Sequence, residues 1–428
     1  MSFYLLIPFA FLILAFIIKM PIGLGMMIGS IAYFLVKGIP LTTVVSTAGY
    51  GIYSSYVLIA IPLFIFTANV MNSSCVTDRI FKFANSIVGR FRGGTAYVNI
   101  LASLIFAGMT GSALADASGL GLIEIDQMSK DGYDRPFSCA ITAITSVIGP
   151  TFPPSIPFVI FAMISGASVG QMFIGGIIPA LLLCVVLGIY VFIISKKRVY
   201  PRGKKVSGKE FLVDTFRALP ALMTPVILLI GIYTGVMTPT EAGAIAGLYT
   251  IVVAFFVYRT LNLKELGKII INTLKSTGSI FLIIAAAYCF SYIINLEQVA
   301  NWLKNLMLGF SSNKYVFLLI TNIVFIILGC FIDVNVTQLV FVPIFIPLAK
   351  ALGINMTHFG VMLCMNMMVG LATPPFGMLL FITAGIGKCS MKRIIREILP
   401  MLGFVFAALI IITYVPQTVL WLPSMMAR

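Results

Sequence analysis

Apolar runs long enough to cross a lipid bilayer recur along the whole chain. A membrane-spanning helix needs about 20 mainly apolar residues, and runs near or above that length lie at 3–18, 22–36, 54–71, 137–165, 171–194, 221–236, 240–258, 278–295, 356–386 and 398–415. Only 10% of the 428 residues are charged, whereas soluble domains carry about a quarter. The runs are continuous, which disfavours a β-barrel. The predicted fold class is therefore an all-α polytopic membrane protein, and a soluble enzyme is excluded.

The charge and the cysteines fit this class. The formal net charge is +15, but the Lys and Arg residues lie in short loops between apolar runs, where they mark the cytoplasmic side and do not indicate nucleic-acid binding. The seven cysteines show no CxxC spacing, which argues against a zinc site or a disulfide framework. The first run has no basic residue before it and no small-residue cleavage site after it, so we expect it to remain as the first span.

Two apolar regions and two of the runs are interrupted. Residues 93–130 and 315–350 each contain two short apolar halves around a polar cluster, at 110–116 and 333–337. This pattern predicts re-entrant hairpins, which expose backbone at membrane depth and need protein or water to cover it. Adjacent prolines and a glycine break two spans, in stretches 149–154 and 370–375.

The interruptions recur at one offset of 221 residues. It relates Gly108 to Gly329, Gly149 to Gly370, Pro153 and Pro154 to Pro374 and Pro375, and Pro179 to Pro400. A hairpin followed by a broken span therefore occurs twice, which predicts two structural repeats. The expected division is 1–92 (scaffold and surface helix), 93–194 (first hairpin and broken helix), 195–220 (basic linker), 221–314 (second scaffold with its surface helix) and 315–428 (second hairpin, broken helix and last span).

Loop charge predicts that the repeats are inverted. Segments 79–92, 196–217, 259–275 and 388–396 are basic, whereas the equivalent segments of the other repeat carry at most one basic residue, such as Lys304 in 300–313 and Arg428 in the tail. By the positive-inside rule, equivalent loops then lie on opposite faces. Ten crossings with both termini outside satisfy this arrangement. The hairpins enter from opposite sides, so their tips meet near the midplane, where transporters place substrate and coupling ions.

Each hairpin tip carries one carboxylate and one hydroxyl four residues apart. The first has Ser112 and Asp116, and the second has Asp333 and Thr337 in the reverse order. An intramembrane carboxylate costs roughly 2.5–3.5 kcal/mol and is presumptively functional. Together with the carbonyl oxygens that the broken spans leave unpaired, each tip has the oxygen ligands of a sodium site. Helix capping by these side chains explains them equally, and protons remain as couplers although neither tip has a second acid or a histidine nearby.

A carboxylate-bearing substrate would favour the positive ends of half-helices. Such helices are predicted to start near Ser155 and Phe376, with hydroxyls from Ser112, Thr151, Ser155 and Thr373 within reach.

Other polar residues have simpler interpretations. The sequence ThrProThrGlu at 238–241 predicts a capped helix start, with Glu241 closing the box. We expect Arg135 to anchor the topology at the cytoplasmic face, in preference to binding an anion. Glu124 and Asp126 lie near the cytoplasmic end of the first hairpin, where both can be solvated. A single histidine, His358, disfavours a histidine-based catalytic or metal site.

Three further segments bear on membrane association and on nucleotide binding. Segments 79–92 and 259–275 have the spacing of amphipathic helices on the inner leaflet, and a plain cytoplasmic linker explains them equally well. GlyLeuGlyLeu at 119–122 lacks the spacing and the lysine of a phosphate loop. No machinery for ATP hydrolysis is therefore visible.

Four motifs carry a resemblance to a known family. They are GlyMetThrGlySerAlaLeuAlaAsp (108–116), IleGlyProThrPheProProSer (148–155), MetThrProThrGluAlaGlyAla (237–244) and GlyLeuAlaThrProProPheGly (370–377). Through them the chain resembles the large membrane subunit of TRAP (tripartite ATP-independent periplasmic) transporters. The resemblance covers essentially the whole chain.

The resemblance implies a sodium-driven secondary importer with an elevator mechanism, in the bacterial inner membrane. Such proteins take an organic acid from a periplasmic binding protein and work with a small four-helix membrane subunit, here expected to be a separate chain. Overall likeness favours sialic acid, with a C4-dicarboxylate next. Two or more Na⁺ ions are implied, with no nucleotide and no transition metal.

Matching positions give the expected site residues. The sodium set is Ser112, Asp116, Gly149, Phe152, Pro154, Asp333, Thr337, Gly370 and Thr373. The substrate set is Ser112 and Ser155, with Thr151 and Thr373.

Three other classes compete with a transporter. A channel also uses re-entrant loops, but two different broken spans facing two hairpins favour alternating access. An intramembrane enzyme needs a nucleophile with a base or a metal, for which one histidine and dispersed acids offer little. A purely structural subunit would not explain intramembrane aspartates.

Overall fold

The computed structural model describes residues 3–18, 20–53, 55–73, 76–203, 206–299 and 313–426, and every regular element in these ranges is a helix. Lys304 and Arg428, which entered the comparison of loop charge, lie outside the described residues.

The first half of the chain forms ten α-helices and three short 3₁₀ segments. Their bounds are η1 (Phe3–Leu5), α1 (Leu6–Ile17), α2 (Ile22–Lys37), α3 (Thr42–Tyr53), η2 (Tyr56–Ile59), α4 (Ala60–Ser73), α5 (Val76–Val88), α6 (Gly94–Thr110), α7 (Ala113–Lys130), α8 (Arg135–Thr145), η3 (Ser146–Thr151), α9 (Ile156–Ser165) and α10 (Val169–Lys197).

The second half repeats this order with fewer interruptions. Its described elements are α11 (Gly208–Tyr233), α12 (Pro239–Val252), the π-helical turn η4 (Val253–Val257), α13 (Leu263–Leu296), α15 (Lys314–Phe331), α16 (Val334–Ala351), α17 (Met356–Leu371), α18 (Met378–Gly387), α19 (Met391–Tyr414) and α20 (Gln417–Met426).

The helix bounds confirm the repeat. Helix α7 spans 113–130 and α16 spans 334–351, so both ends differ by 221 residues, and α8 and α17 begin at 135 and 356 with the same difference. We call α6, α7, α8, η3 and α9 arm 1, and α15, α16, α17 and α18 arm 2. In each arm a helical hairpin precedes a helix that is interrupted where the sequence predicts a break.

The interruptions have the expected cause. Helix α8 passes into the 3₁₀ turn η3 and restarts as α9 after Pro154, with a bend of 45° across the pair. Helix α17 ends at Leu371, and α18 begins only at Met378. Between these points the adjacent prolines cannot donate to a helical ladder.

Hairpin 1 folds back on itself. The Thr95 hydroxyl, at the start of α6, donates to the Asp131 carboxylate, which follows the end of α7. The two ends of the hairpin therefore lie on the same side of the molecule. Its tip contains Gly111 at a φ of 56°, a left-handed backbone conformation that favours glycine.

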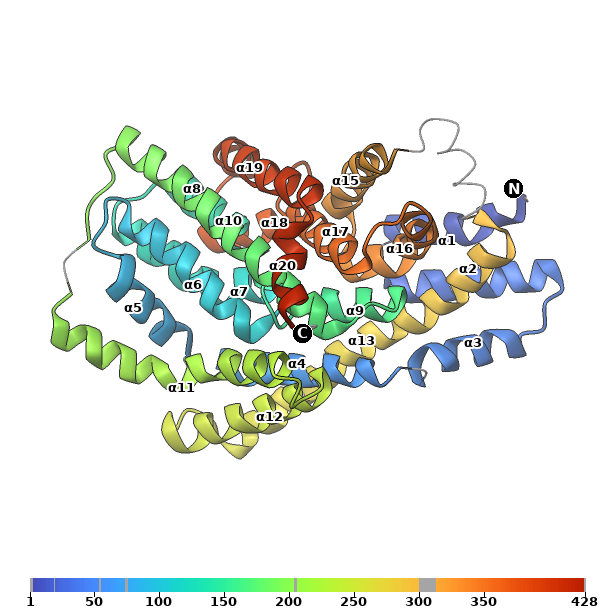
Figure 1. The fold of residues 1–428 in the computed structure, drawn as a ribbon, viewed down its shortest axis with the longest axis horizontal. Coiled ribbons are helices and arrows are strands. Elements are labelled where there is room, and N and C mark those ends of the chain that lie inside the picture. Colours follow the sequence, from blue (N-terminus) through green and yellow to red (C-terminus); the bar gives the residue numbers. More distant parts are fainter. Residues whose placement is uncertain are drawn as a thin grey trace.

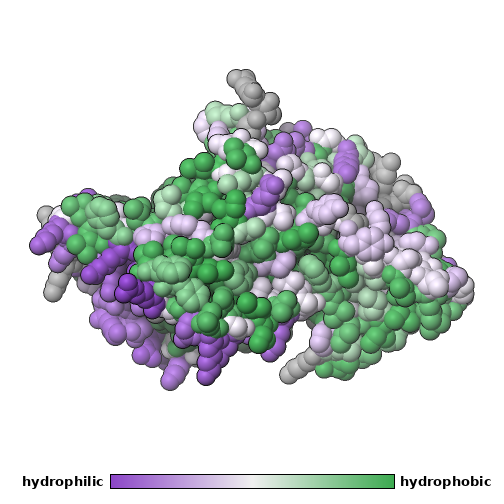
Figure 2. Space-filling model, turned by 90° about the horizontal axis from the view of Figure 1, so that it is seen from below, coloured by the Kyte–Doolittle hydropathy of each residue, from purple (hydrophilic) through white to green (hydrophobic). Residues whose placement is uncertain are grey.

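The four basic segments lie on one side. Arg92 and Arg202 form an isolated antiparallel bridge, Arg198 Nη2 lies 2.8 Å from Glu397 Oε2, and the Arg79 guanidinium lies 3.7 Å from the centre of the Tyr258 ring. The first contact joins segments 79–92 and 196–217. The other two reach the residue after segment 388–396 and the residue before segment 259–275, so all four segments are neighbours, as the loop-charge argument requires. Figure 2 shows hydrophilic side chains gathered at the left, the end at which α5 and the start of α11 lie in Figure 1. That this side is cytoplasmic remains a prediction.

Two expectations about connecting segments need correction. Segment 259–275 is not a separate surface helix, because α13 continues through it into the following span as one helix of 34 residues. Half of the expected linker 195–220 belongs to α11, which begins at Gly208 behind a Ser207 cap.

Helix α5 is amphipathic, but its apolar face packs on α6 and α11, so protein and not lipid covers it.

The two arms are packed crosswise. Helix α9 of arm 1 contacts α16 of arm 2, and α18 of arm 2 contacts α7 and α8 of arm 1. In Figure 1 the helices α11, α12, α4, α13 and α3 form the lower edge, and arm 2 lies above them. Each half-helix thus completes the packing of the other repeat's hairpin, which holds the two tips together.

By length and composition, eight described helices can span a membrane, or nine with the bent pair of α8–η3 and α9. This set includes α15 and α16 of hairpin 2 and omits the shorter α1 and α2. The ten crossings remain a prediction, because composition does not distinguish a hairpin half from a full span.

Candidate substrate and cation site

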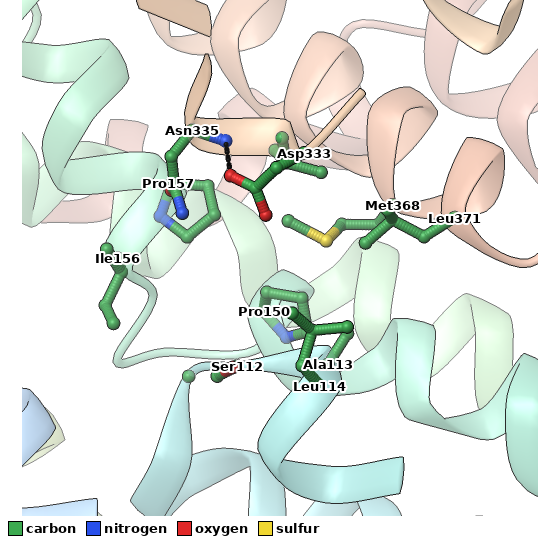
Figure 3. Close-up of a pocket in the computed structure, with 12 residues that line it drawn as sticks. Ser112, Ala113, Leu114, Pro150, Ile156, Pro157, Asp333, Asn335, Met368 and Leu371 are labelled. Carbon is green, nitrogen blue, oxygen red and sulfur yellow. Dashed lines mark hydrogen bonds between the residues drawn. The ribbon is translucent and has the colours of Figure 1, made fainter. Parts of the chain in front are cut away.

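A small cavity lies between the two hairpin tips. Its lining residues come from tip 1 (Gly111, Ser112, Ala113 and Leu114), the first break (Pro150, Ile156 and Pro157), tip 2 (Asp333, Val334 and Asn335) and helix α17 (Met368 and Leu371). Figure 3 shows Asp333 and Ser112 on opposite sides of this space. The tips therefore meet, as the inverted repeat predicts.

Three helices begin at this cavity. Residues of the first turn of α7 (Ala113, Leu114), α9 (Ile156, Pro157) and α16 (Val334, Asn335) all line it. The first turn of a helix carries backbone N–H groups without intrahelical partners and the positive end of the helix dipole. Three such ends around one space favour a bound anion.

Ser112 and Asp333 occupy equivalent places at the two tips. Each is the N-cap of the second hairpin helix: Ser112 Oγ accepts from Ala115 N at 3.4 Å, and Asp333 Oδ1 accepts from Asn335 N at 2.9 Å. The capping interpretation is correct for both residues. It does not exclude a ligand role, because both also line the cavity.

One turn further along, Asp116 and Thr337 are buried within their own arms. Thr337 Oγ1 donates to the Asp333 carbonyl at 3.0 Å. Asp116 is 1% exposed, and in the described part of the chain neither of its carboxylate oxygens has a hydrogen-bond partner. An unpaired buried carboxylate costs several kcal/mol, and a cation would remove that cost.

Each tip lies against a break. A Cβ placed on Gly111 would come within 2.4 Å of the Pro154 carbonyl oxygen, and one on Gly149 would lie 3.7 Å from Ser112. Ser112, Gly149 and Pro154 are therefore brought together. Phe152 lies close by, since its ring is 3.6 Å from a Cβ placed on Gly108.

The second tip also lies against its break. A Cβ on Gly370 would come within 2.8 Å of the Gly329 backbone. The Cys330 thiol also lies 3.8 Å from the Pro374 carbonyl. Of the expected sodium set, Asp333, Thr337 and Gly370 thus belong to one compact region.

Three expected hydroxyls do not line the cavity. Thr151 Oγ1 donates to Val147 O at 2.9 Å, Ser155 Oγ to Pro150 O at 2.5 Å, and Thr373 Oγ1 to Val369 O at 2.7 Å. Their protons are used by local backbone, although each oxygen retains a lone pair. Phe376 lies at a different cavity, with Cys330 and Ile332, so the start of α18 does not join the three helix starts.

The structure adds residues that the sequence did not single out. Asn335 lines the cavity, and its Oδ1 is buried without a partner in the described residues. Met368 lines it from α17. The sequence shows Asn335 within the polar cluster at 333–337. That Asn335 lines the cavity depends on how the second hairpin packs against arm 1.

The expectation that Glu124 is solvated is wrong. This side chain is 1% exposed, whereas Asp126 is solvated and pairs with Lys130 at 2.6 Å. The two residues lie on opposite faces of α7, and the face of Glu124 is covered by α8.

Two other expectations can be placed. The capping box at 238–241 is confirmed, since Thr238 N donates to Glu241 Oε2 at 2.7 Å and Glu241 N donates to Thr238 Oγ1 at 3.3 Å. Arg135 begins α8 at the basic side, exposed and away from the lining of the cavity.

Re-entrant hairpins and broken helices in inverted repeats, around a small central cavity, define a multi-pass membrane protein with the fold of secondary transporters. Residues 5–418 match the sequence model of the family described as "Tripartite ATP-independent periplasmic transporter, DctM component". The chain belongs to this family of TRAP large permeases. It is not an enzyme, because its relatives are transporter permeases.

Individual relatives agree with this assignment. The chain is 38% identical over 406 residues to the sialic acid TRAP transporter large permease protein SiaM of Vibrio cholerae, covering 95% of each chain. It is 37% identical over 369 residues to the C4-dicarboxylate TRAP transporter large permease protein DctM of Pseudomonas aeruginosa, covering 86% of each. With the sialic acid TRAP transporter permease protein SiaT of Haemophilus influenzae it shares 36% identity over 96% of this chain and 66% of the relative.

A solved structure shares the fold. The YdaH transporter of Alcanivorax borkumensis superimposes with a TM-score of 0.64 over 87% of both chains, at 13% sequence identity. At that identity the likeness concerns the fold alone.

Proposed function

We propose that this chain is the large membrane subunit of a sodium-coupled importer of an organic acid. Sialic acid is the favoured substrate and a C4-dicarboxylate the next. The observation that carries the proposal is the convergence of the starts of α7, α9 and α16 on one cavity, because three positive helix ends suit a carboxylate. The relatives support both substrates, and the longer match to SiaM, over 406 residues against 369 for the DctM of Pseudomonas aeruginosa, supports their order.

Sodium coupling is supported by the charge of the cavity. Asp333 lines it, and none of its lining residues is Lys or Arg. An anionic substrate would therefore meet an uncompensated carboxylate in a poorly solvated space. A cation bound at Asp333 would remove this repulsion, so cation and anion would each raise the other's affinity. Oxygen ligands suit a hard cation such as Na⁺.

The size of the cavity supports a conformational step. Its volume is about 50 Å³, whereas pockets for small organic molecules measure roughly 300–1,000 Å³. Substrate can enter only when the tips separate. Since the arms are packed crosswise, we propose that they move together against the helices at the lower edge of Figure 1, as an elevator.

The proposed assembly has two further components. A periplasmic binding protein delivers the acid, and a small four-helix membrane subunit accompanies this chain. This chain and the small subunit lie in the bacterial inner membrane, with the termini of this chain in the periplasm. The tripartite description of the family supports a transporter of several parts.

Reconstitution tests the proposal. The chain would be placed in proteoliposomes with the small subunit and, separately, with a sialic acid-binding or a dicarboxylate-binding protein. We expect saturable uptake of one loaded acid under an inward sodium gradient, and its loss when an ionophore collapses that gradient. Uptake driven by a proton gradient in sodium-free buffer would overturn sodium coupling, and a non-saturating flux would indicate a channel.

A further inference from the structure

Arm 1 contains a chain of polar side chains between α6, α7 and α8, away from the cavity. Asn99 is fully buried on α6, its Nδ2 donates to Thr142 Oγ1 at 2.7 Å, and its Oδ1 accepts from Thr145 Oγ1 at 2.6 Å. Ser103 lies one turn nearer the tip on α6, and its hydroxyl is buried without a partner in the described residues. These oxygens extend from the surroundings of Asp116 toward the basic side of the molecule.

Glu124 lies at the far end of this chain. It is 1% exposed, and Thr142 packs against the same stretch of α7, since a Cβ placed on Gly121 would come within 2.9 Å of Thr142 Cγ2. In the described part of the chain its Oε1 has no hydrogen-bond partner, and no described salt bridge includes it. A carboxylate buried in this way is costly unless it binds a cation or a donor.

The fold does not require a carboxylate at this place. The offset of 221 places Phe345 opposite Glu124, and Phe345 belongs to the apolar core. Between the equivalent helices of arm 2 the buried polar side chains include Asn322 and Asn366, which bond to each other, and no buried carboxylate lies in the described part of this arm. The carboxylate of arm 1 therefore carries a desolvation cost that arm 2 avoids, which points to a ligand.

We propose that Glu124, with Thr142 and Asn99, forms an additional monovalent-cation site in arm 1. It rests on the proposed sodium coupling and extends it. Glu124 follows Asp116 by eight residues, which is two turns or about 12 Å along α7. Thr142 packs against Gly121, three residues before Glu124 on α7, and its hydroxyl oxygen accepts from Asn99, whose own oxygen accepts from Thr145. A cation released from Asp116 would thus find a second set of oxygen ligands on its way to the basic side.

The test counts bound sodium, so that it does not depend on transport. Purified protein would be titrated with radioactive ²²Na⁺ in detergent, for the wild type, for Glu124→Gln and for Asp126→Asn. The last is a matched control, because Asp126 is an exposed acid on the same helix. We expect Glu124→Gln to bind one Na⁺ fewer than the wild type, and Asp126→Asn to bind the same number.

A second variant separates folding from binding. Thr142→Val removes a ligand oxygen without changing charge, and we expect it to lower the affinity of one Na⁺ by tenfold or more. Unchanged sodium counts in well-folded Glu124→Gln and unchanged affinity in Thr142→Val would overturn the inference. So would a Glu124→Gln variant that keeps its sodium count but loses a pH dependence of uptake, since Glu124 would then carry a proton. A wild type that binds no sodium would overturn the proposed function itself, which is a different result.

Discussion

Arm 1 and arm 2 share a backbone but place their charges differently. In arm 2 the carboxylate Asp333 caps α16 and lines the cavity, whereas the equivalent cap of arm 1 is the neutral Ser112. The carboxylate of arm 1, Asp116, lies one turn later and is buried between its own helices. One duplicated hairpin thus supplies a charge facing the shared cavity and a second charge held away from it.

This difference separates the binding of an anionic substrate from the binding of cations, which would otherwise conflict. A cavity lined by two carboxylates would repel an organic acid more strongly than one lined by a single carboxylate. The exchange of hydroxyl and carboxylate between the tips gives the chain two carboxylates for the proposed cations while it adds only one negative charge to the cavity.

The largest expected effect comes from removing each carboxylate in turn. Asp333→Asn keeps a good N-cap but loses the charge, so we expect at least about tenfold weaker sodium affinity, with substrate affinity altered as well. Asp116→Asn should weaken sodium affinity similarly and leave the intrinsic affinity for substrate at saturating sodium unchanged. Uptake at varied sodium and substrate concentrations measures both. Identical behaviour of the two variants would break the comparison.

A second pair of variants compares the packing at the breaks. In Gly370→Ala the new Cβ would meet the Gly329 backbone at 2.8 Å, whereas in Gly149→Ala the nearest atom is 3.7 Å away. Overpacking costs typically 1–3 kcal/mol, so we expect a clear loss of stability for Gly370→Ala and little change for Gly149→Ala. Thermal unfolding in detergent, without sodium, checks this. Equal unfolding midpoints for the two variants would show that the backbone around Gly370 is not more tightly packed than the backbone around Gly149.

A third pair compares the buried hydrogen bonds between helices. Asn366 Nδ2 donates to Asn322 Oδ1 at 2.6 Å in arm 2, and the equivalent of Asn366 in arm 1 is Thr145, which donates to Asn99. We expect Asn366→Leu and Thr145→Val each to destabilise the protein by about 0.6 kcal/mol and by no more than about 1.7 kcal/mol, the average and the maximum measured for such bonds in a membrane protein. The same unfolding assay applies. A change well above this range in one variant alone would locate a cooperative network in that arm.

The smallest effect is expected where the two repeats are linked outside the arms. Arg198, after α10, reaches Glu397 on α19 at 2.8 Å, and its side chain is 32% exposed. Ion pairs near the surface contribute about 0–1 kcal/mol, so Arg198→Ala should shift the unfolding midpoint only slightly and less at high salt. A large, salt-independent loss would mean that this ion pair holds the two repeats together.

The sequence alone predicted the elements of both arms. Hydropathy predicts the apolar helices, adjacent prolines predict the breaks, and the offset of 221 residues predicts the repeat. Loop charge predicts one basic side, and the contacts of Arg92 and Arg198 agree with it for the segments that they join. These properties follow from local residue chemistry, because a proline or a run of apolar residues acts on its own stretch of backbone.

Only the tertiary structure decided which faces are covered. Segment 259–275 has the same character as a surface helix in sequence, yet it continues into α13. Glu124 and Asp126 are two residues apart and equally charged, but α8 covers the first and solvent reaches the second. Sequence spacing fixes the angle between two side chains on a helix, and not what lies opposite each of them. That depends on how distant helices pack, and so the cavity, the three helix starts around it and the buried acid of arm 1 became visible only in the fold.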